Sequence, residues 1–225
     1  MSVLTAFFAR YGCLLWTGTV DTIYMTLVST FFAYLIGIPL GVLLTITKRT
    51  GLLPAPRFNT VFGGIINIMR SIPFIILVLL LTPVTRFIVG TYIGSTAANV
   101  PLIISAFPFV ARMVESSLEE VDHGVIEAAQ SMGATNFQIV TRVLLVESIP
   151  SLLRGLSICV ITVLGYTAIT GAVGAGGLGQ VAISYGLNRG QKDVMYAAIL
   201  VLIALICIIQ IIFALSTRRV DKRNR

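Results

Sequence analysis

The chain has 225 residues, of which 56% are hydrophobic and only 11% are charged. Because soluble domains carry about 25% charged residues, this composition excludes a soluble enzyme and indicates an integral membrane protein. The net charge of +7 would suggest a nucleic-acid partner in a soluble protein. In a membrane protein, an excess of basic residues more often reflects the orientation of the chain in the bilayer, because cytoplasmic loops are rich in Lys and Arg. We therefore expect no nucleic-acid partner.

Five apolar segments are long enough to cross a bilayer, which takes about 20 helical residues. They cover residues 19–46, 58–84, 95–113, 149–172 and 194–215. Residues 4–16 form a shorter apolar stretch that ends in Trp16, which is typical of a helix lying on the bilayer surface. The sequence therefore predicts an all-α integral membrane protein with five transmembrane helices in a single domain, residues 1–225.

The basic residues divide unevenly between the two sides of these spans. Eleven fall on one side: Lys48, Arg49, Arg57, Arg112, Arg142, Arg154, Arg218, Arg219, Lys222, Arg223 and Arg225. Four fall on the other side, namely Arg10, Arg86, Arg189 and Lys192, and Arg70 falls within the second span. Because cytoplasmic loops carry the excess of Lys and Arg, the C-terminus is predicted in the cytoplasm and the N-terminus outside.

Few ionisable side chains fall within the spans. Asp21 is predicted at the outer end of the first span, and most other carboxylates fall in the cytoplasmic loop after the third. Since carboxylates inside a membrane mark proton and ion pathways, their scarcity argues against a carrier coupled to ions. The three cysteines are widely spaced and His123 is the single histidine, so no metal site is expected.

Residues 171–179 (GAVGAGGLG) contain a GxGxxG pattern. A dinucleotide site needs a strand before this pattern and a βαβ unit around it, neither of which fits the end of a membrane helix. We interpret the segment as a flexible or tightly packed turn between the fourth and fifth spans. The chain also has no GxxxxGK[ST] motif, so a nucleotide that drives this protein would bind to another subunit.

Arg70, Ser71 and Pro73 lie together in the second predicted span. Two interpretations are open for this group. The backbone carbonyls freed by Pro73 could line a cavity beside Arg70, or Arg70 could extend to the cytoplasmic interface as a snorkelling side chain.

Gly37 and Gly41 form a GxxxG pattern in the first span, with Pro39 between them. Such a pattern lets a neighbouring helix approach closely. A local bend at Pro39 is an equally good interpretation.

The loop between the third and fourth spans, residues 115–148, contains two short predicted helices. Residues 122–133 begin with an Asp and end with a Gly, which indicates a helix. Thr135 and Gln138 have the spacing of a capping box that opens a second helix. The two helices form an elbow near Gly133, and the second is predicted to carry Phe137, Val140 and Leu144 toward the fourth span.

This loop resembles the cytoplasmic signature of the permeases of ATP-binding-cassette (ABC) importers. Glu127-Ala128-Ala129 and Gly133 match that signature, although Val143 replaces its Ile and its Pro is absent from the usual place. Residues 69–74 (MRSIPF), 129–135 (AQSMGAT), 165–168 (GYTA) and 171–179 (GAVGAGGLG) together resemble the methionine-importer branch of the family.

The resemblance implies a type I ABC importer permease fold and a homodimer in a bacterial inner membrane. Two ATPase subunits, which bind ATP and Mg²⁺, would dock beneath it, and an extracytoplasmic binding protein would deliver methionine (D or L) or a close derivative. The implied coupling helix to the ATPase includes Glu127, Ala128, Ala129, Met132, Gly133 and Ala134. Tyr166, Thr167 and Thr170 are implied pathway residues, beside the candidates Arg70, Ser71 and Pro73.

Two other functions are considered. A stand-alone channel or secondary carrier would move solutes without an ATPase, and the scarcity of carboxylates in the spans argues against ion coupling. An enzyme embedded in the membrane would need His, Asp or Cys side chains clustered at one depth, and the sequence indicates no such cluster. The chain is therefore expected to transport rather than catalyse, and to hold no cofactor.

Overall fold

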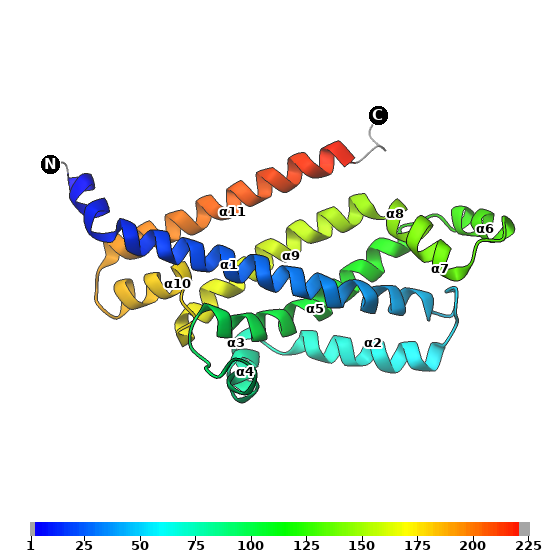
Figure 1. Ribbon diagram of the computed structural model, residues 1–225, viewed down its shortest axis with the longest axis horizontal. Coiled ribbons are helices and arrows are strands. Elements are labelled where there is room, and N and C mark those ends of the chain that lie inside the picture. Colours follow the sequence, from blue (N-terminus) through cyan, green and yellow to red (C-terminus); the bar gives the residue numbers. More distant parts are fainter. Residues whose placement is uncertain (1–2, 221–225) are drawn as a thin grey trace. The chain divides into compact units, whose positions relative to one another are not determined.

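A computed structural model describes residues 3–220, apart from the side chains of residues 3–6, 8 and 218–220. All regular structure in this described part is helical, which confirms the prediction of an all-helical membrane protein (Figure 1). Four helices are long and apolar enough to cross a membrane, and there are five spans if the bent pair Pro56–Ser71 and Phe74–Leu80 counts as one. Five of the basic residues that were used to predict orientation, Arg218, Arg219, Lys222, Arg223 and Arg225, lie outside the described side chains.

The elements follow one another through short loops. The α-helices are α1 (Val3–Ile46), α2 (Pro56–Ser71), α3 (Phe74–Leu80), α4 (Thr82–Val89), α5 (Ser95–Glu119), α6 (His123–Ser131), α7 (Asn136–Gln138), α8 (Leu145–Glu147), α9 (Ile149–Thr170), α10 (Gly177–Val181) and α11 (Lys192–Val220). A 3₁₀ turn, Gly171–Val173, follows α9, and π-helical turns occupy Ile139–Leu144 and Ala182–Leu187.

The N-terminal helix differs from the prediction, because α1 runs without a break through the boundary expected between residues 16 and 19. Gly18 does not end the helix but brings it against α10. A Cβ atom at this position would lie 3.1 Å from Val181 Cγ2 and 3.4 Å from Leu178 N. The predicted helix boundary between residues 16 and 19 is therefore wrong.

The second predicted span, residues 58–84, is divided among α2, α3 and the start of α4. Ile72 is extended (ψ 122°) and Pro73 precedes α3 with φ −56°. A proline lacks an amide N–H and restricts the residue before it to extended conformations, so the helix breaks here. The chain then leaves α4 at Gly90, whose φ of +83° favours glycine.

By contact the chain forms two compact units, of which the first contains the described residues up to Phe31 together with Pro73–Ser105 and Val160–Gln210. Its core includes the buried residues Leu15, Leu178, Val181, Val194 and Ala198. The glycine segment packs tightly, since Leu178 N donates a 2.9 Å hydrogen bond to Thr22 Oγ1 and Gly174, Gly176 and Gly177 all have positive φ. A flexible or tightly packed turn was predicted over residues 171–179. The structure confirms the tight packing but places residues 171–173 in a 3₁₀ turn and residues 177–179 in the helix α10.

The second unit contains Phe32–Ile72, Ala106–Cys159 and the described residues from Ile211 onward. Leu44, Ile66 and Ala111 form a buried cluster in it. The GxxxG pattern of α1 packs against α5, because a Cβ at Gly37 would lie 2.6 Å from Val110 Cγ1 and one at Gly41 would lie 2.6 Å from Val114 Cβ. Close approach of a neighbouring helix is therefore the correct interpretation of this pattern.

Candidate functional site

The helix α6 is formed as the loop sequence predicts. Asp122 is its N-cap, and its carboxylate accepts a 2.6 Å hydrogen bond from Gly124 N. An N-cap acceptor satisfies one of the free amide groups of the first turn. The chain leaves the helix through Gly133, whose φ of +80° is a left-handed conformation that a side chain disfavours.

The capping box after the elbow is also present. Gln138 N donates to Thr135 Oγ1, and Thr135 N donates to Gln138 Oε1. Phe137, Val140 and Leu144 were predicted to point toward the fourth span, and this prediction is partly wrong. Leu144 is buried as predicted and Val140 is half-buried, but Phe137 is 76% exposed. Phe137 lies two residues before the buried Ile139. Because two residues correspond to about half a helical turn, the two side chains point to opposite faces of the helix.

The predicted coupling residues lie on both sides of this elbow. Ala129 is buried, whereas Glu127, Ala128 and Gly133 are exposed and Met132 is 82% exposed. Ala134 is half-buried, and its amide donates back to Ala129 O across the elbow. The elbow therefore exposes the small residues Ala128 and Gly133 together with the large apolar side chain of Met132.

A groove of about 510 Å³ separates α6 from the ends of α1 and α5. Its α6 wall consists of His123, Ile126, Glu127 and Gln130. Lys48 and Glu119 line it from the other helices. The same unit thus holds the elbow and the ends of two long helices around one cavity.

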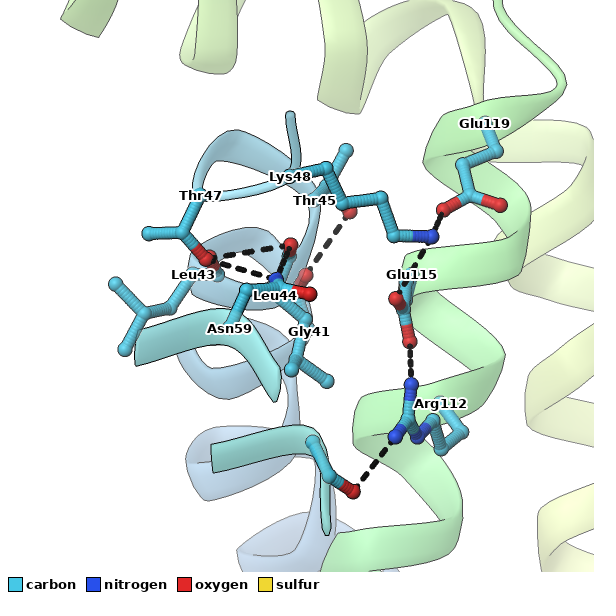
Figure 2. Close-up of polar contacts among 11 residues, drawn as sticks. Gly41, Leu43, Leu44, Thr45, Thr47, Lys48, Asn59, Arg112, Glu115 and Glu119 are labelled. Atoms are coloured by element: carbon cyan, nitrogen blue, oxygen red, sulfur yellow. Dashed lines mark hydrogen bonds and ion pairs between the residues drawn. The ribbon is translucent and has the colours of Figure 1, made fainter. Parts of the chain in front are cut away.

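Charged side chains connect these helix ends, as Figure 2 shows. Lys48 Nζ lies 2.9 Å from Glu115 Oε1 and also bonds Glu119. Arg112 Nη1 lies 2.7 Å from Glu115 Oε2, and Arg112 Nη2 donates a 2.7 Å hydrogen bond to Gly63 O of α2. These four charged residues, Lys48, Arg112, Glu115 and Glu119, are called the ionic cluster below.

Burial alone would lower the pKa of Lys48, but the hydrogen bonds and charges of Glu119 and Glu115 outweigh it and raise the pKa above its ordinary value. From the sequence, Lys48 and Arg112 were assigned only to a side of the membrane, and the cluster was not predicted. The available signal was the spacing of Arg112, Glu115 and Glu119, which places all three on one face of a helix.

A second polar contact ties α1 to α2 in the same unit. Asn59 Nδ2 donates to Leu44 O at 2.6 Å and to Thr47 Oγ1 at 2.9 Å (Figure 2). Asn59, near the start of α2, therefore joins this helix to the end of α1 across the turn between them.

The candidate pathway residues are distributed over the two units. In the second unit, Arg70 is exposed with its Cζ 5.9 Å from the centre of the Phe109 ring, and Ser71 Oγ donates to Asn67 O. Pro73 is exposed and belongs to the first unit.

The remaining pathway candidates lie on α9 in the first unit. Tyr166 stacks on Phe74, with ring centres 4.2 Å apart and planes inclined by 7°. Thr167 and Thr170 are buried, and their hydroxyls donate to the carbonyls of Leu164 and Thr167 in their own helix. Within residues 3–220, no group of three or more His, Cys, Asp or Glu side chains is placed to hold a metal ion.

Known proteins similar to this chain include methionine permeases. The "Probable D-methionine transport system permease protein MetI" of Vibrio cholerae is 47% identical over 222 residues, which is 99% of each chain. The "Methionine import system permease protein MetP" of Bacillus subtilis is 46% identical and covers 93% of this chain and 94% of its own.

A solved structure agrees with these relatives. A chain of the MetNI methionine ABC transporter in an inward-facing conformation superposes with a TM-score of 0.92 at 44% identity, covering 99% of this chain and 100% of its own. The family described as binding-protein-dependent transport system inner membrane component matches residues 37–223. This chain belongs to that family, the multi-pass inner-membrane permeases of ABC importers.

Proposed function

We propose that this chain is the permease subunit of an ABC importer for methionine. The observation that carries the proposal is the exposed elbow α6–Gly133–α7 in a chain that is similar over almost its whole length to methionine permeases. Methionine in the D or L form, or a close derivative, is the substrate we infer from the names of these relatives.

The proposed assembly contains two copies of this chain, two ATPase subunits and an extracytoplasmic binding protein. Each copy forms a single permease domain, residues 1–225, with five spans, an external N-terminus, a cytoplasmic C-terminus and the coupling loop at 115–148. ATP and Mg²⁺ are held by the ATPase. The family match supports this arrangement, as does the exposure of the elbow for contact with another protein.

In the proposed mechanism, the ATPase grips the coupling helix through the surface formed by Glu127, Ala128, Met132 and Gly133, which Ala129 and Ala134 support from within. Closure of the ATPase pair then moves this helix and opens the passage to the other side of the membrane. Arg70, Ser71, Pro73, Tyr166, Thr167 and Thr170 are the proposed pathway residues. Stacking on Phe74 supports the position of Tyr166.

Replacement of Gly133 by Trp tests this function in complexes reconstituted into liposomes. Because Gly133 has a positive φ, any side chain at this position strains the backbone. A Cβ there would meet nothing within 4 Å, so the added bulk lies only at the elbow surface. We expect ATP-driven methionine uptake to fall by about tenfold or more, as expected for loss of a hot-spot contact. Gly190→Trp is the matched control, because Gly190 also has positive φ and open space but lies before α11.

Coupled uptake at the normal rate in Gly133→Trp complexes would contradict the proposal. Uptake by liposomes that contain the permease without an ATPase would support the stand-alone carrier instead. Competition between labelled L-methionine and unlabelled D-methionine, leucine or norleucine would identify the substrate class.

A further inference from the structure

The ionic cluster connects α1 and α2 of the second unit to α5, which lies about 50 to 70 residues further along the chain. Lys48 lies two residues beyond the end of α1 and binds Glu115 and Glu119 in the last turns of α5 (Figure 2). Arg112 of α5 reaches the backbone of α2 at Gly63. Only three residues separate the end of α5 from the first residue of α6. A displacement of α6 therefore reaches the cluster through a short connection.

The contact between Arg112 and α2 depends on a glycine. A Cβ at position 63 would lie 2.9 Å from Arg112 Nη2, and the next nearest atoms, in Arg112 and Leu44, would be 3.7 Å away. A side chain at residue 63 would therefore crowd the guanidinium, which would have to shift from its present place against the helix backbone. Its planar fork holds Glu115 and the Gly63 carbonyl in one fixed geometry, which an ammonium group cannot do.

Stability alone does not account for this arrangement. Glu115 is 5% exposed, and the buried Nε atom of Arg112 has no hydrogen-bond partner within the described residues. Burial of charges and of an unpaired donor costs free energy, so a buried ion pair is weak evidence of stabilisation. The geometry is better explained by a need to keep α1, α2 and α5 in fixed register.

We propose that Arg112, held by Glu115, which Lys48 also binds, is a positioning residue that transmits movement of the coupling helix to α2, the helix that ends at Arg70 and Ser71. This inference rests on the proposed function. The cluster makes the cytoplasmic parts of α1, α2 and α5 move as one body when α6 is displaced. Without the cluster, α6 and α5 would move while α2 lagged behind, and ATP would be hydrolysed without transport.

Two adjacent glycines of α2 provide the test. Gly63→Ala displaces the guanidinium from the Gly63 carbonyl without removing a charge, whereas a Cβ at Gly64 meets nothing within 4 Å. In reconstituted complexes we expect Gly63→Ala to lower the number of substrate molecules moved per ATP by about fivefold or more, the usual scale of coupling between sites. The rate of ATP hydrolysis and the amount of assembled complex should stay within about twofold of wild type, and Gly64→Ala should match wild type in all three.

Arg112 variants give an independent readout. Arg112→Lys keeps the charge but cannot hold both partners, so it should lower the same ratio, and Arg112→Gln should lower it further. Arg49→Gln is the control, because Arg49 is exposed and has no ion-pair partner within residues 3–220.

The outcomes separate this inference from the proposed function. Wild-type complexes that show no ATP-driven uptake would overturn the proposed function itself. Normal wild-type uptake together with equal transport per ATP in Gly63→Ala and Gly64→Ala would overturn only the role of Arg112. Parallel loss of ATP hydrolysis, transport and assembly in both the Gly63 and the Arg112 variants would show a structural role and also overturn it.

Discussion

At the scale of single residues, several glycines of this chain lie at close contacts between helices. Gly41 lies where α1 crosses α5, and an added Cβ would lie 2.6 Å from Ala111 O and from Val114 Cβ. Real Cβ atoms do not approach backbone oxygen so closely, so α5 would have to move. Helices in membranes associate through such small residues because lipid provides little hydrophobic drive.

Gly41→Ala is expected to destabilise the protein by about 1–3 kcal/mol through overpacking, although alanine is the better helix former. Gly12→Ala in the same helix is the control, because a Cβ there meets nothing within 4 Å. It should leave stability unchanged or raise it by up to about 1 kcal/mol. Thermal unfolding in detergent would measure both, and equal midpoints for the two variants would refute the packing argument.

At the scale of elements, the short helix α6 depends on its caps. It has nine residues, and isolated helices of fewer than about 12 residues are marginal in water. The carboxylate of Asp122 at one end and the left-handed Gly133 at the other therefore define the helix. The partner ATPase would meet a preformed helix and would not have to order one.

Asp122→Ala should cost about 1 kcal/mol of helix stability and lower the affinity for the ATPase subunit by about fivefold, since a frayed helix must be ordered on binding. Asp122→Asn keeps a capping oxygen and should bind like wild type. Titration of the purified permease with its ATPase would show the difference. Equal affinity of the alanine and asparagine variants would mean that the cap does not matter for docking.

At the scale of the whole molecule, the proposed topology places the turn between α1 and α2 on the elbow side of the membrane and the loop after α4 on the opposite side. That requires the bent pair α2 and α3 to act as one span, the fifth beside the four long helices. The excess of Lys and Arg on the elbow side supports this orientation.

Single cysteines would test the topology after Cys13, Cys159 and Cys207 are replaced. A membrane-impermeant maleimide should label Thr50→Cys only in inside-out vesicles, because Thr50 is exposed in the turn between α1 and α2. The same reagent should label Thr91→Cys, which follows α4 in an exposed loop, only in right-side-out cells. Labelling of both cysteines from one side would rule out five spans.

Local physical chemistry is the reason that much of this protein could be predicted from sequence. The number of consecutive apolar residues indicates where the chain can span a membrane. Pro73 accounts for the break between α2 and α3, because proline interrupts a helix. Cap residues set both ends of α6 and the start of α7. The continuity of α1 was not predicted, because the expected boundary rested on the short apolar stretch 4–16 and on Trp16, whereas the contact of Gly18 with α10 exists only in the tertiary structure.

The sequence by itself determined that the chain is a helical membrane protein, and its loop motif indicated the permease family that the comparisons established. Only the tertiary structure decided that Lys48 meets Glu115 and Glu119 of α5, and that Arg112 of α5 meets the backbone of α2 at Gly63. Caps and span lengths depend on neighbouring residues, whereas these contacts join positions that packing alone brings together across about 50 to 70 residues of chain.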